Sequence, residues 1–321
     1  MKLIDQLLNG DRGALAKALT RIENREPGYQ EILSRLYPQA GCAYKVGLTG
    51  PPGSGKSTLV DQIAAALIAA DETVGILAVD PTSPFTGGAF LGDRVRMQRL
   101  ATDTRVFIRS MASRGSSGGL AEATIDAAIA MNAFGFDHIL IETVGVGQTE
   151  LEIAEAADTT VVVLVPESGD GVQVMKAGLI EIADIFVVNK ADHEGADRFV
   201  GELTYLRSLG ESGPEKEKEN ETSWKSPILK TVATTGEGIE QLIEAIGEHH
   251  EFQERNGLLE SKRLAQLTAQ LRRSLESRIR RAVAAELGDL DGMAAEIAAG
   301  KRDFHEVLDA LFDRLTTRKG G

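Results

Sequence analysis

The sequence predicts an α/β fold: a P-loop domain on a mostly parallel β-sheet, with helical N- and C-terminal extensions. Short runs rich in valine and isoleucine alternate with helical segments, and a phosphate-binding motif follows the first run. The expected strands are Lys45–Thr49, Val74–Val79, Arg105–Ile108, His138–Glu142, Thr160–Val165, Asp184–Val188 and Pro227–Val232. The helical segments expected between them include Lys56–Ala70, Gly119–Phe134 and Val172–Ile182. Such alternation places helices on both faces of a parallel sheet.

Helical patterns flank this alternating region on both sides. Residues 1–44 repeat leucine at helical spacing, with a break at residues 10–13, and the strands stop near residue 250. We therefore expect an N-terminal helical extension at residues 1–44, a nucleotide-binding domain at 45–250 and a C-terminal helical arm at 251–321. The arm carries too many charges for a buried core helix, so it is either a solvated appendage or a dimerisation surface.

Composition narrows the classes of partner. The 321 residues carry a formal net charge of −13, which disfavours a general nucleic-acid or anionic-membrane partner. The single cysteine, Cys42, excludes an intrachain disulfide and a multi-cysteine zinc site. No apolar run approaches the roughly 18–20 residues that span a bilayer, and we expect a cytoplasmic protein. The adjacent pair His249 and His250 is interpreted as a solvated helix end, because neighbouring residues on a helix point in different directions.

A phosphate-binding loop follows the first expected strand. The stretch GPPGSGKS at residues 50–57 fits Gly-x-x-x-x-Gly-Lys-Ser and opens a helical segment, which is the context that the motif requires. Its glycines let backbone N–H groups converge on phosphate oxygens, Lys56 neutralises the β- and γ-phosphates, and Ser57 offers a hydroxyl to Mg²⁺. The residues expected to bind a nucleoside triphosphate here are Gly50, Gly53, Ser54, Gly55, Lys56 and Ser57.

The stretch NKAD at residues 189–192 indicates guanine as the base. The carboxylate of Asp192 can accept from both the ring N–H and the exocyclic amine of guanine, whereas adenine lacks that pair of donors. Lys190 can lie along the base, and Asn189 can tie this loop to the phosphate loop. Ala233 and Thr234, after the last expected strand, would form the second loop that contacts the base. We therefore expect GTP and GDP as ligands.

Three acidic residues are candidates for a magnesium site. Asp80 and Glu142 end apolar strands, and Asp93 lies in a glycine-containing segment. Carboxylates at strand ends on the phosphate side can hold Mg²⁺ directly or through its water shell, together with the Ser57 hydroxyl. Helix capping is the alternative role for these residues, above all for Asp93.

The stretch ETVGVGQT at residues 142–149 resembles the hydrolytic switch of small G proteins, in which a glutamine directly follows the glycine. Here Val146 follows Gly145, and Gln148 comes two positions late. We expect Gly145 to turn its N–H toward the γ-phosphate and Glu142 to act through a water molecule. With Lys56, these residues form a catalytic set that stays slow until Gln148 or a partner's residue completes it.

Taken together, GPPGSGKST, DPTSPFTGGAFLGDRVRM, ETVGVGQTE and NKAD resemble the MeaB/ArgK GTPases, the G-protein chaperones of methylmalonyl-CoA mutase and similar adenosylcobalamin-dependent mutases. The resemblance implies a G domain, a homodimer formed by the C-terminal arm, and GTP hydrolysis that gates transfer and protection of cobalamin. It also implies that Thr58 joins the phosphate-binding residues and that Glu167–Lys176 senses the mutase.

Two features depart from the family and its wider class. Pro51 and Pro52 stand where some members of the class carry a lysine, which argues against catalysis by a lysine shared across a dimer. The segment at residues 210–227 is more acidic than the family leads us to expect. The alternatives are a P-loop kinase for a small molecule or protein, and a nickel-insertion GTPase, which would require a cysteine and histidine cluster that this sequence lacks.

Overall fold

The computed structural model describes residues 2–41, 43–80, 100, 102–112, 122–143, 152–166, 178–211, 223–286 and 290–317. The chain divides into two compact units, residues 1–266 and residues 267–321.

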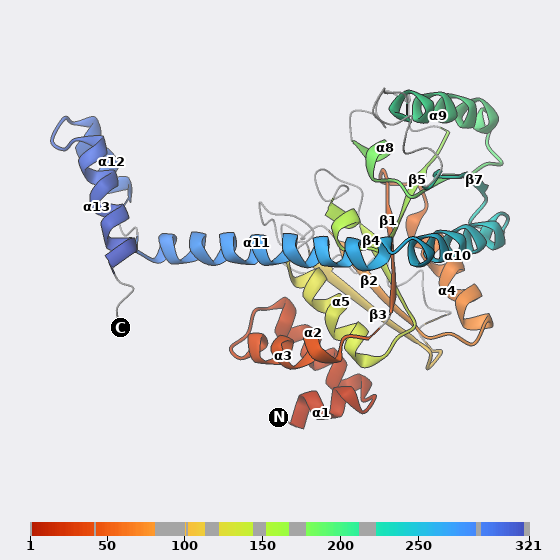
Figure 1. The fold of residues 1–321 in the computed structure, drawn as a ribbon, viewed down its shortest axis with the longest axis horizontal. Coiled ribbons are helices and arrows are strands. Elements are labelled where there is room, and N and C mark those ends of the chain that lie inside the picture. Colours follow the sequence, from red (N-terminus) through yellow and green to blue (C-terminus); the bar gives the residue numbers. More distant parts are fainter. Residues whose placement is uncertain are drawn as a thin grey trace. The chain divides into compact units, whose positions relative to one another are not determined.

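The first unit is built on a parallel sheet, which has seven strands within the described residues (Figure 1). Their order is β3-β2-β4-β1-β5-β6-β7, and every pair of neighbours is parallel. The strands are β1 (Tyr44–Thr49), β2 (Val74–Asp80), β3 (Val106–Ala112), β4 (His138–Thr143), β5 (Thr159–Leu164), β6 (Ile185–Asn189) and β7 (Ile228–Thr231). The predicted α/β class with a parallel sheet is confirmed, and each predicted strand matches one of these to within a few residues.

One face of the sheet is covered by α4 (Lys56–Ala69) and α10 (Ile239–Arg255). Apolar side chains of both helices, such as Ile63 and Leu242, pack against alternate strand residues such as Val46. This alternation follows from the two-residue period of a strand, which sends successive side chains to opposite faces. The phosphate motif therefore opens a helix that is itself part of the core.

The other face is covered by the N-terminal helices, by α5 and by two later helices (Figure 1). Leu7, Leu15 and Leu19 of the N-terminal helices are fully buried in the same cluster as residues of the sheet. These helices are α1 (Lys2–Leu8), α2 (Arg12–Glu23), α3 (Tyr29–Leu36), α5 (Glu122–Phe134), α8 (Leu179–Ile182) and α9 (Ala196–Glu211), and two short 3₁₀ helices, η1 (Tyr37–Gln39) and η3 (Ile153–Glu155), join them. The N-terminal helices thus share the hydrophobic core of the sheet.

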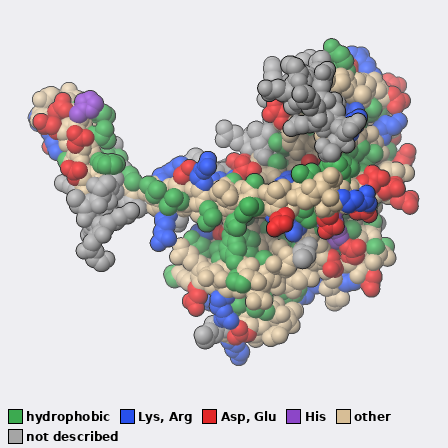
Figure 2. All heavy atoms as spheres, in the orientation of Figure 1, with side chains coloured by type: hydrophobic (Ala, Val, Ile, Leu, Met, Phe, Trp, Pro, Cys, Tyr) green, Lys and Arg blue, Asp and Glu red, His purple; other side chains and the backbone are tan. Residues whose placement is uncertain are grey.

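The second unit is helical. It consists of the later part of α11 (Leu258–Glu286), α12 (Leu290–Ala298) and α13 (Phe304–Thr317). Exposed apolar side chains recur at helical spacing on α11, and hydrophobic side chains are visible along that helix in Figure 2. Within the described residues, no helix has the length and hydrophobicity that a membrane span requires.

Candidate nucleotide-binding site

The phosphate loop joins the end of β1 to the start of α4, and two of its glycines have no room for a side chain. A Cβ atom on Gly50 would lie 2.0 Å from the carbonyl oxygen of Val163, and one on Gly55 would lie 2.3 Å from Nδ2 of Asn189. Both glycines also have positive φ, 137° and 89°, which side chains disfavour. The backbone is therefore held in a tight turn that ends at a helix N-terminus, an arrangement suited to binding phosphate.

Lys56 is the first residue of α4, and its ammonium group lies within this loop. The residue is 5% exposed, and Nζ donates hydrogen bonds to the carbonyl oxygens of Gly50 at 2.7 Å and Pro51 at 2.9 Å. A strongly solvated ammonium is rarely buried without such partners. The loop therefore holds a positive charge at the place where the motif predicts the β- and γ-phosphates.

Ser57 and Glu142 bring two oxygen groups together beside this loop. The Ser57 hydroxyl donates to Oε1 of Glu142 at 2.5 Å, and Glu142 is only 6% exposed. The sheet accounts for the meeting, because β4 pairs with β1 in a register that sets Glu142 opposite Leu48 near the start of the loop. A hydroxyl and a carboxylate are the hard oxygen ligands that Mg²⁺ prefers, so this pair fits such an ion.

The other predicted magnesium and switch residues are less fully defined. Asp80 is the last residue of β2, and β2 pairs with β4 so that Ala78 lies opposite Glu142. The backbone of Asp80 thus reaches the edge of the sheet where Glu142 lies, while its side chain is outside the described part of the structure. Asp93, Gly145 and Gln148 also lie outside the described residues.

Asn189, at the end of β6, connects three parts of the site. Its Nδ2 donates to the carbonyl oxygen of Ser54 at 2.7 Å, and its Oδ1 accepts from the Thr231 hydroxyl and the Ala233 N–H, each at 3.1 Å. Asn189 is 2% exposed, so these contacts are made in a buried setting. This is the tie to the phosphate loop expected from the sequence, and binding of a nucleotide by these residues stays a prediction.

The two loops predicted to contact the base lie next to each other, because Asn189 pairs with Thr231 across β6 and β7. The backbone turns sharply at Lys190, which has a positive φ of 55°, and the Asp192 side chain is exposed. In the second loop Ala233 is buried, whereas Thr234 is exposed. An exposed carboxylate next to this turn can meet a ligand from solvent, which is what base recognition by Asp192 requires.

Gln62 is a member of this region that the sequence reasoning missed. Its Nε2 donates to the carbonyl oxygen of Ala233 at 3.0 Å and so joins α4 to the second of these loops. No motif contains Gln62, and its partner is 171 residues away in the chain. Only the packing of α4 near the loop after the last strand brings the two residues together.

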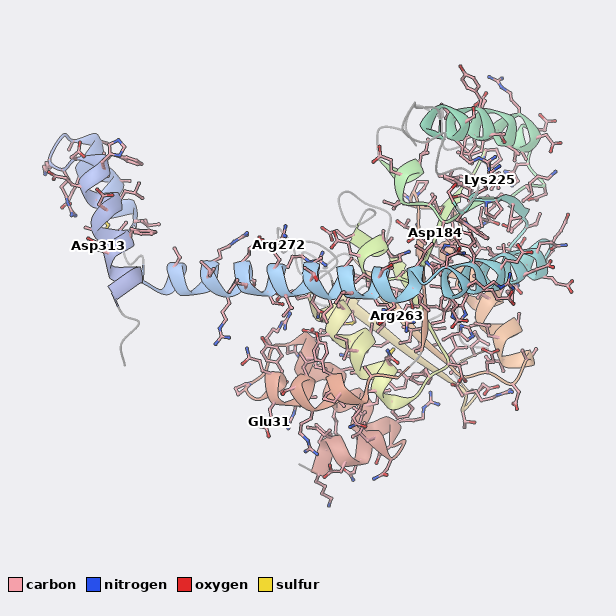
Figure 3. The ribbon with its side chains drawn as sticks, in the orientation of Figure 1. Glu31, Asp184, Lys225, Arg263, Arg272 and Asp313 are labelled. Carbon is pink, nitrogen blue, oxygen red and sulfur yellow. The ribbon has the colours of Figure 1, made fainter. Side chains whose placement is uncertain are left out.

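A second polar cluster, which we call the amino-edge cluster, lies at the opposite end of the strands and consists of Lys45, Asp158, Thr159, Asp184, His249, Lys262 and Arg263. The fully buried Asp158 accepts from Arg263 at 2.8 Å and from the backbone N–H of Lys45 at 2.9 Å. Burial alone would raise the pKa of Asp158, but the Arg263 hydrogen bonds and the Lys45 charge outweigh it and the pKa is lowered. Asp184 and Arg263 are labelled in Figure 3.

His249 belongs to this cluster, so its interpretation as part of a solvated helix end is wrong. Its side chain is 3% exposed, Nδ1 shares a hydrogen bond with the Thr159 hydroxyl at 2.7 Å, and Nε2 lies 3.4 Å from Oδ1 of Asp184. Burial lowers the pKa of His249 to about 4, which the nearby Asp184 charge offsets only in part. His249 lies on the apolar face of α10. Interpreting the two histidines together overlooked this position.

Comparison with known proteins gives the site its context. Residues 15–287 match the model of a family described as methylmalonyl-CoA mutase-associated GTPase MeaB. A putative GTPase of Pyrococcus horikoshii is 47% identical over 317 residues, which cover 99% of this chain and 98% of the relative. The methylmalonic aciduria type A homolog of Mus musculus, described as mitochondrial, is 33% identical over 286 residues. The match covers 83% of this chain and 66% of the relative.

A solved structure shows the same fold. The crystal structure described as LAO/AO transport system kinase matches with a TM-score of 0.70 and 26% sequence identity. The match covers 98% of this chain and 96% of that chain. Both helical extensions therefore fall within the matched region.

Proposed function

This chain belongs to the MeaB family of GTPases, and from that membership we propose that it couples GTP hydrolysis to the cofactor state of an adenosylcobalamin-dependent acyl-CoA mutase. The GTPase activity itself follows from the family and from relatives named as GTPases. The proposed output is loading and protection of cobalamin in a mutase of the methylmalonyl-CoA type. The family match carries this proposal. It is supported by the placement of the phosphate loop, the two loops predicted to contact the base, and Glu142 at one edge of the sheet.

The phosphates would bind over the loop from Gly50 to Thr58. Lys56 already lies within that loop, and its carbonyl partners can give way to phosphate oxygens of opposite charge. Ser57 and Glu142 would hold Mg²⁺, joined by Asp80 and Asp93. Such an ion, when bound, offsets the negative charge of the phosphates.

For hydrolysis we propose that Glu142 orients the attacking water, directly or through the shell of the metal. Gly145 would offer its N–H to the γ-phosphate, and Gln148 or a residue of the partner would complete the site. Since no glutamine directly follows Gly145, we expect slow hydrolysis by the isolated protein and faster hydrolysis with the mutase.

For the base, we propose that Asp192 accepts both guanine donors, that Lys190 lies along the ring and that Ala233 and Thr234 contact its other edge. Asn189 would not contact the base. It would hold the phosphate loop and the second base loop in a fixed position relative to each other. The contacts made by Asn189 support this placement because they join the phosphate loop to the second base loop in a buried setting.

We also propose a homodimer formed through the C-terminal arm. Leu271, Leu275 and Ile279 recur at four-residue spacing on α11 and are 53–65% exposed, and Phe304 and Leu308 recur in the same way on α13. Apolar stripes of this kind are commonly buried against another helix. Residues 167–176, which lie outside the described part of the structure, are proposed to meet the mutase, and the protein is proposed to act in the cytoplasm.

Of the alternatives, the kinase has one point in its favour, since a solved relative carries that description. For a nickel-insertion role, the described residues contain no group of three or more His, Cys, Asp or Glu side chains that could hold a metal.

Phosphate release tests the proposal. Multiple turnovers of GTP would be followed with the protein alone, with a purified adenosylcobalamin-dependent mutase, and with candidate phosphate acceptors, using Lys56→Ala as the inactive control. We expect slow release alone and at least about tenfold stimulation by the mutase, in line with GTPases completed in trans. Fast release that the mutase leaves unchanged would contradict the chaperone role, and phosphate transfer to an acceptor would support the kinase.

A pull-down from native extract gives a second test of the partner. It would be performed with GDP and with a non-hydrolysable GTP analogue, using Lys56→Ala as the matched bait. Recovery of a cobalamin-dependent mutase in a nucleotide-dependent manner supports the proposal. Its absence, with the mutase shown to be present in the extract, counts against it.

A further inference from the structure

Gln62 joins the phosphate-binding helix to a loop that would contact the base. It lies on α4, which begins at Lys56, and its Nε2 donates to the carbonyl oxygen of Ala233 at 3.0 Å. We propose that Gln62 is a positioning residue for guanine recognition, and that it sets the dissociation rate of the nucleotide. This inference rests on the placement of the base proposed above.

Both backbone polar groups of Ala233 form hydrogen bonds to side chains. Its N–H donates to Oδ1 of Asn189 at 3.1 Å, and its carbonyl oxygen accepts from Gln62 at 3.0 Å. Ala233 is 3% exposed, so these two contacts take the place of water. Asn189 also binds the phosphate loop, so the Ala233 backbone is held on one side by a residue that contacts that loop and on the other by a residue of the helix that follows it.

The contact with Gln62 also fixes the peptide group that follows Ala233. The described peptide bonds are trans, so the N–H of Thr234 points opposite to the Ala233 carbonyl and therefore away from Gln62. Guanine carries a carbonyl at position 6, where adenine carries an amine. A backbone N–H held in a fixed direction favours the carbonyl, because an amine would oppose donor to donor.

The surroundings of Gln62 determine how much nucleotide binding should weaken when its hydrogen bond is removed. The side chain is half-buried in an open groove of about 530 Å³ between α4 and α10, lined mainly by small and apolar side chains. Ala65, Gly236 and Ile239 are among the lining residues. Water can enter such a groove and partly replace the lost amide, so the contact is worth about one neutral hydrogen bond.

Nucleotide dissociation from three variants tests this role. Gln62→Leu removes the donor at similar volume, Gln62→Glu keeps the shape but sets an acceptor against the carbonyl, and Gln241→Leu makes the same apolar change at an exposed position of α10. We expect GDP release to be about 5- to 10-fold faster in Gln62→Leu and faster still in Gln62→Glu. Gln241→Leu should release GDP at the wild-type rate.

The chemistry of the base separates positioning from general loosening of the fold. IDP keeps the 6-oxygen of GDP, whereas the diphosphate of 2-aminopurine riboside lacks it. We expect Gln62→Leu to weaken GDP and IDP by the same factor and to leave the 2-aminopurine nucleotide within about twofold of wild type. An equal loss for all three nucleotides, or Gln62→Glu releasing GDP no faster than Gln62→Leu, would overturn the inference.

The same assay separates this inference from the base placement on which it rests. If Asp192→Asn leaves the order of GDP, IDP and XDP affinities unchanged, the proposed base site is wrong and Gln62 cannot position it. If Asp192→Asn changes that order while Gln62→Leu behaves as wild type, the base site stands and the role of Gln62 is refuted.

Discussion

The two edges of the parallel sheet carry polar side chains in opposite arrangements. At the carboxyl edge, Lys56 and Asn189 are bonded mainly to backbone groups of the phosphate and base loops, and Asp192 is exposed. At the amino edge, the buried Asp158 is bonded to Arg263 of α11, and the buried His249 of α10 is bonded to Thr159 of β5. The first edge is the one at which we propose that the nucleotide binds, and at the second edge charged and polar side chains join helices to the sheet.

The same strands connect these edges. β1 begins beside Lys45 and leads to the phosphate loop, and β6 begins after Asp184 and ends with Asn189. In parallel sheets ligands bind outside the carboxyl ends of the strands, so chemistry is expected at one end only. The comparison therefore predicts that substitutions at the amino edge change stability, whereas substitutions at the carboxyl edge change nucleotide binding and hydrolysis.

The largest effect is expected from Asp158→Asn at the amino edge. The substitution leaves Arg263 and Lys45 without their buried carboxylate, and breaking such a pair commonly costs about 3–5 kcal/mol of unfolding free energy. Urea unfolding measures this loss, and GDP affinity of the folded protein should stay at the wild-type value.

The matched control for this substitution is Asp197→Asn. Asp197 is bonded to Lys230 at 2.9 Å but is 90% exposed, so its removal should cost less than about 1 kcal/mol. Equal losses for the two variants would show that burial of the amino-edge cluster has no special weight.

Glu142→Gln should have the next largest effect, at the carboxyl edge. The amide can still accept from Ser57, so GDP binding should survive, but the substitution removes the charge proposed to orient the attacking water. Loss of such a group lowers rates by about 10²–10⁴-fold, and single-turnover phosphate release would measure it. Glu142→Asp keeps the charge at shorter reach, so its rate of phosphate release should lie between those of wild type and Glu142→Gln. A wild-type rate of hydrolysis in Glu142→Gln would exclude the proposed role.

Asp192→Asn should lower GDP affinity by about 100-fold, because two hydrogen bonds to a charged acceptor are lost. Xanthosine diphosphate should gain affinity, since its ring carbonyl suits an amide donor. Fluorescent-nucleotide competition measures both changes, and unfolding should be unaffected because Asp192 is exposed. Glu194→Gln, at another exposed position of the same loop, is the control, and an unchanged base preference in Asp192→Asn would remove the assignment.

The sequence predicts the carboxyl edge well because its signals are local. The glycines of the phosphate loop, the Val- and Ile-rich strands and the NKAD stretch each occupy a few consecutive residues. The parallel sheet then brings these stretches to one edge, as the contacts of Asn189 show. The fold could therefore be predicted from motifs and periodicity, and so could the meeting of the predicted site segments at one edge, whereas nucleotide binding by them stays a prediction.

The amino edge could not be predicted in the same way, because its residues find their partners far along the chain. Asp158 meets Arg263 across 105 residues, and His249 meets Thr159 across 90. His249 lies at helical spacing from the buried Leu242 and Ile246 of α10, but its neighbour His250 suggested a solvated pair instead. Gln62 escaped notice for the same reason, since only the packing of α4 beside the second base loop gives it a partner.

The smallest predicted effect concerns pH and again separates the two edges. Burial lowers the pKa of His249 to about 4, below the value of about 6.5 in an unfolded chain. Between these values the unfolded chain binds one more proton, so this stabilising contribution is complete above pH 6.5 and is lost as the pH falls toward 4. The relation between proton binding and stability gives a loss of about 2 kcal/mol between pH 7.5 and pH 5.

Urea unfolding followed through Trp224 would measure that loss, because the tryptophan ring lies 4.8 Å from the His249 ring. His249→Gln keeps hydrogen-bonding capacity but does not titrate, so its stability should fall by about 2 kcal/mol less than wild type over the same pH range. His250→Gln changes the adjacent, more exposed histidine and should follow the wild-type dependence. If His249→Gln and wild type lose equal stability, the amino-edge histidine does not titrate on unfolding in this range, and the division between a stabilising edge and a ligand-binding edge must rest on Asp158 alone.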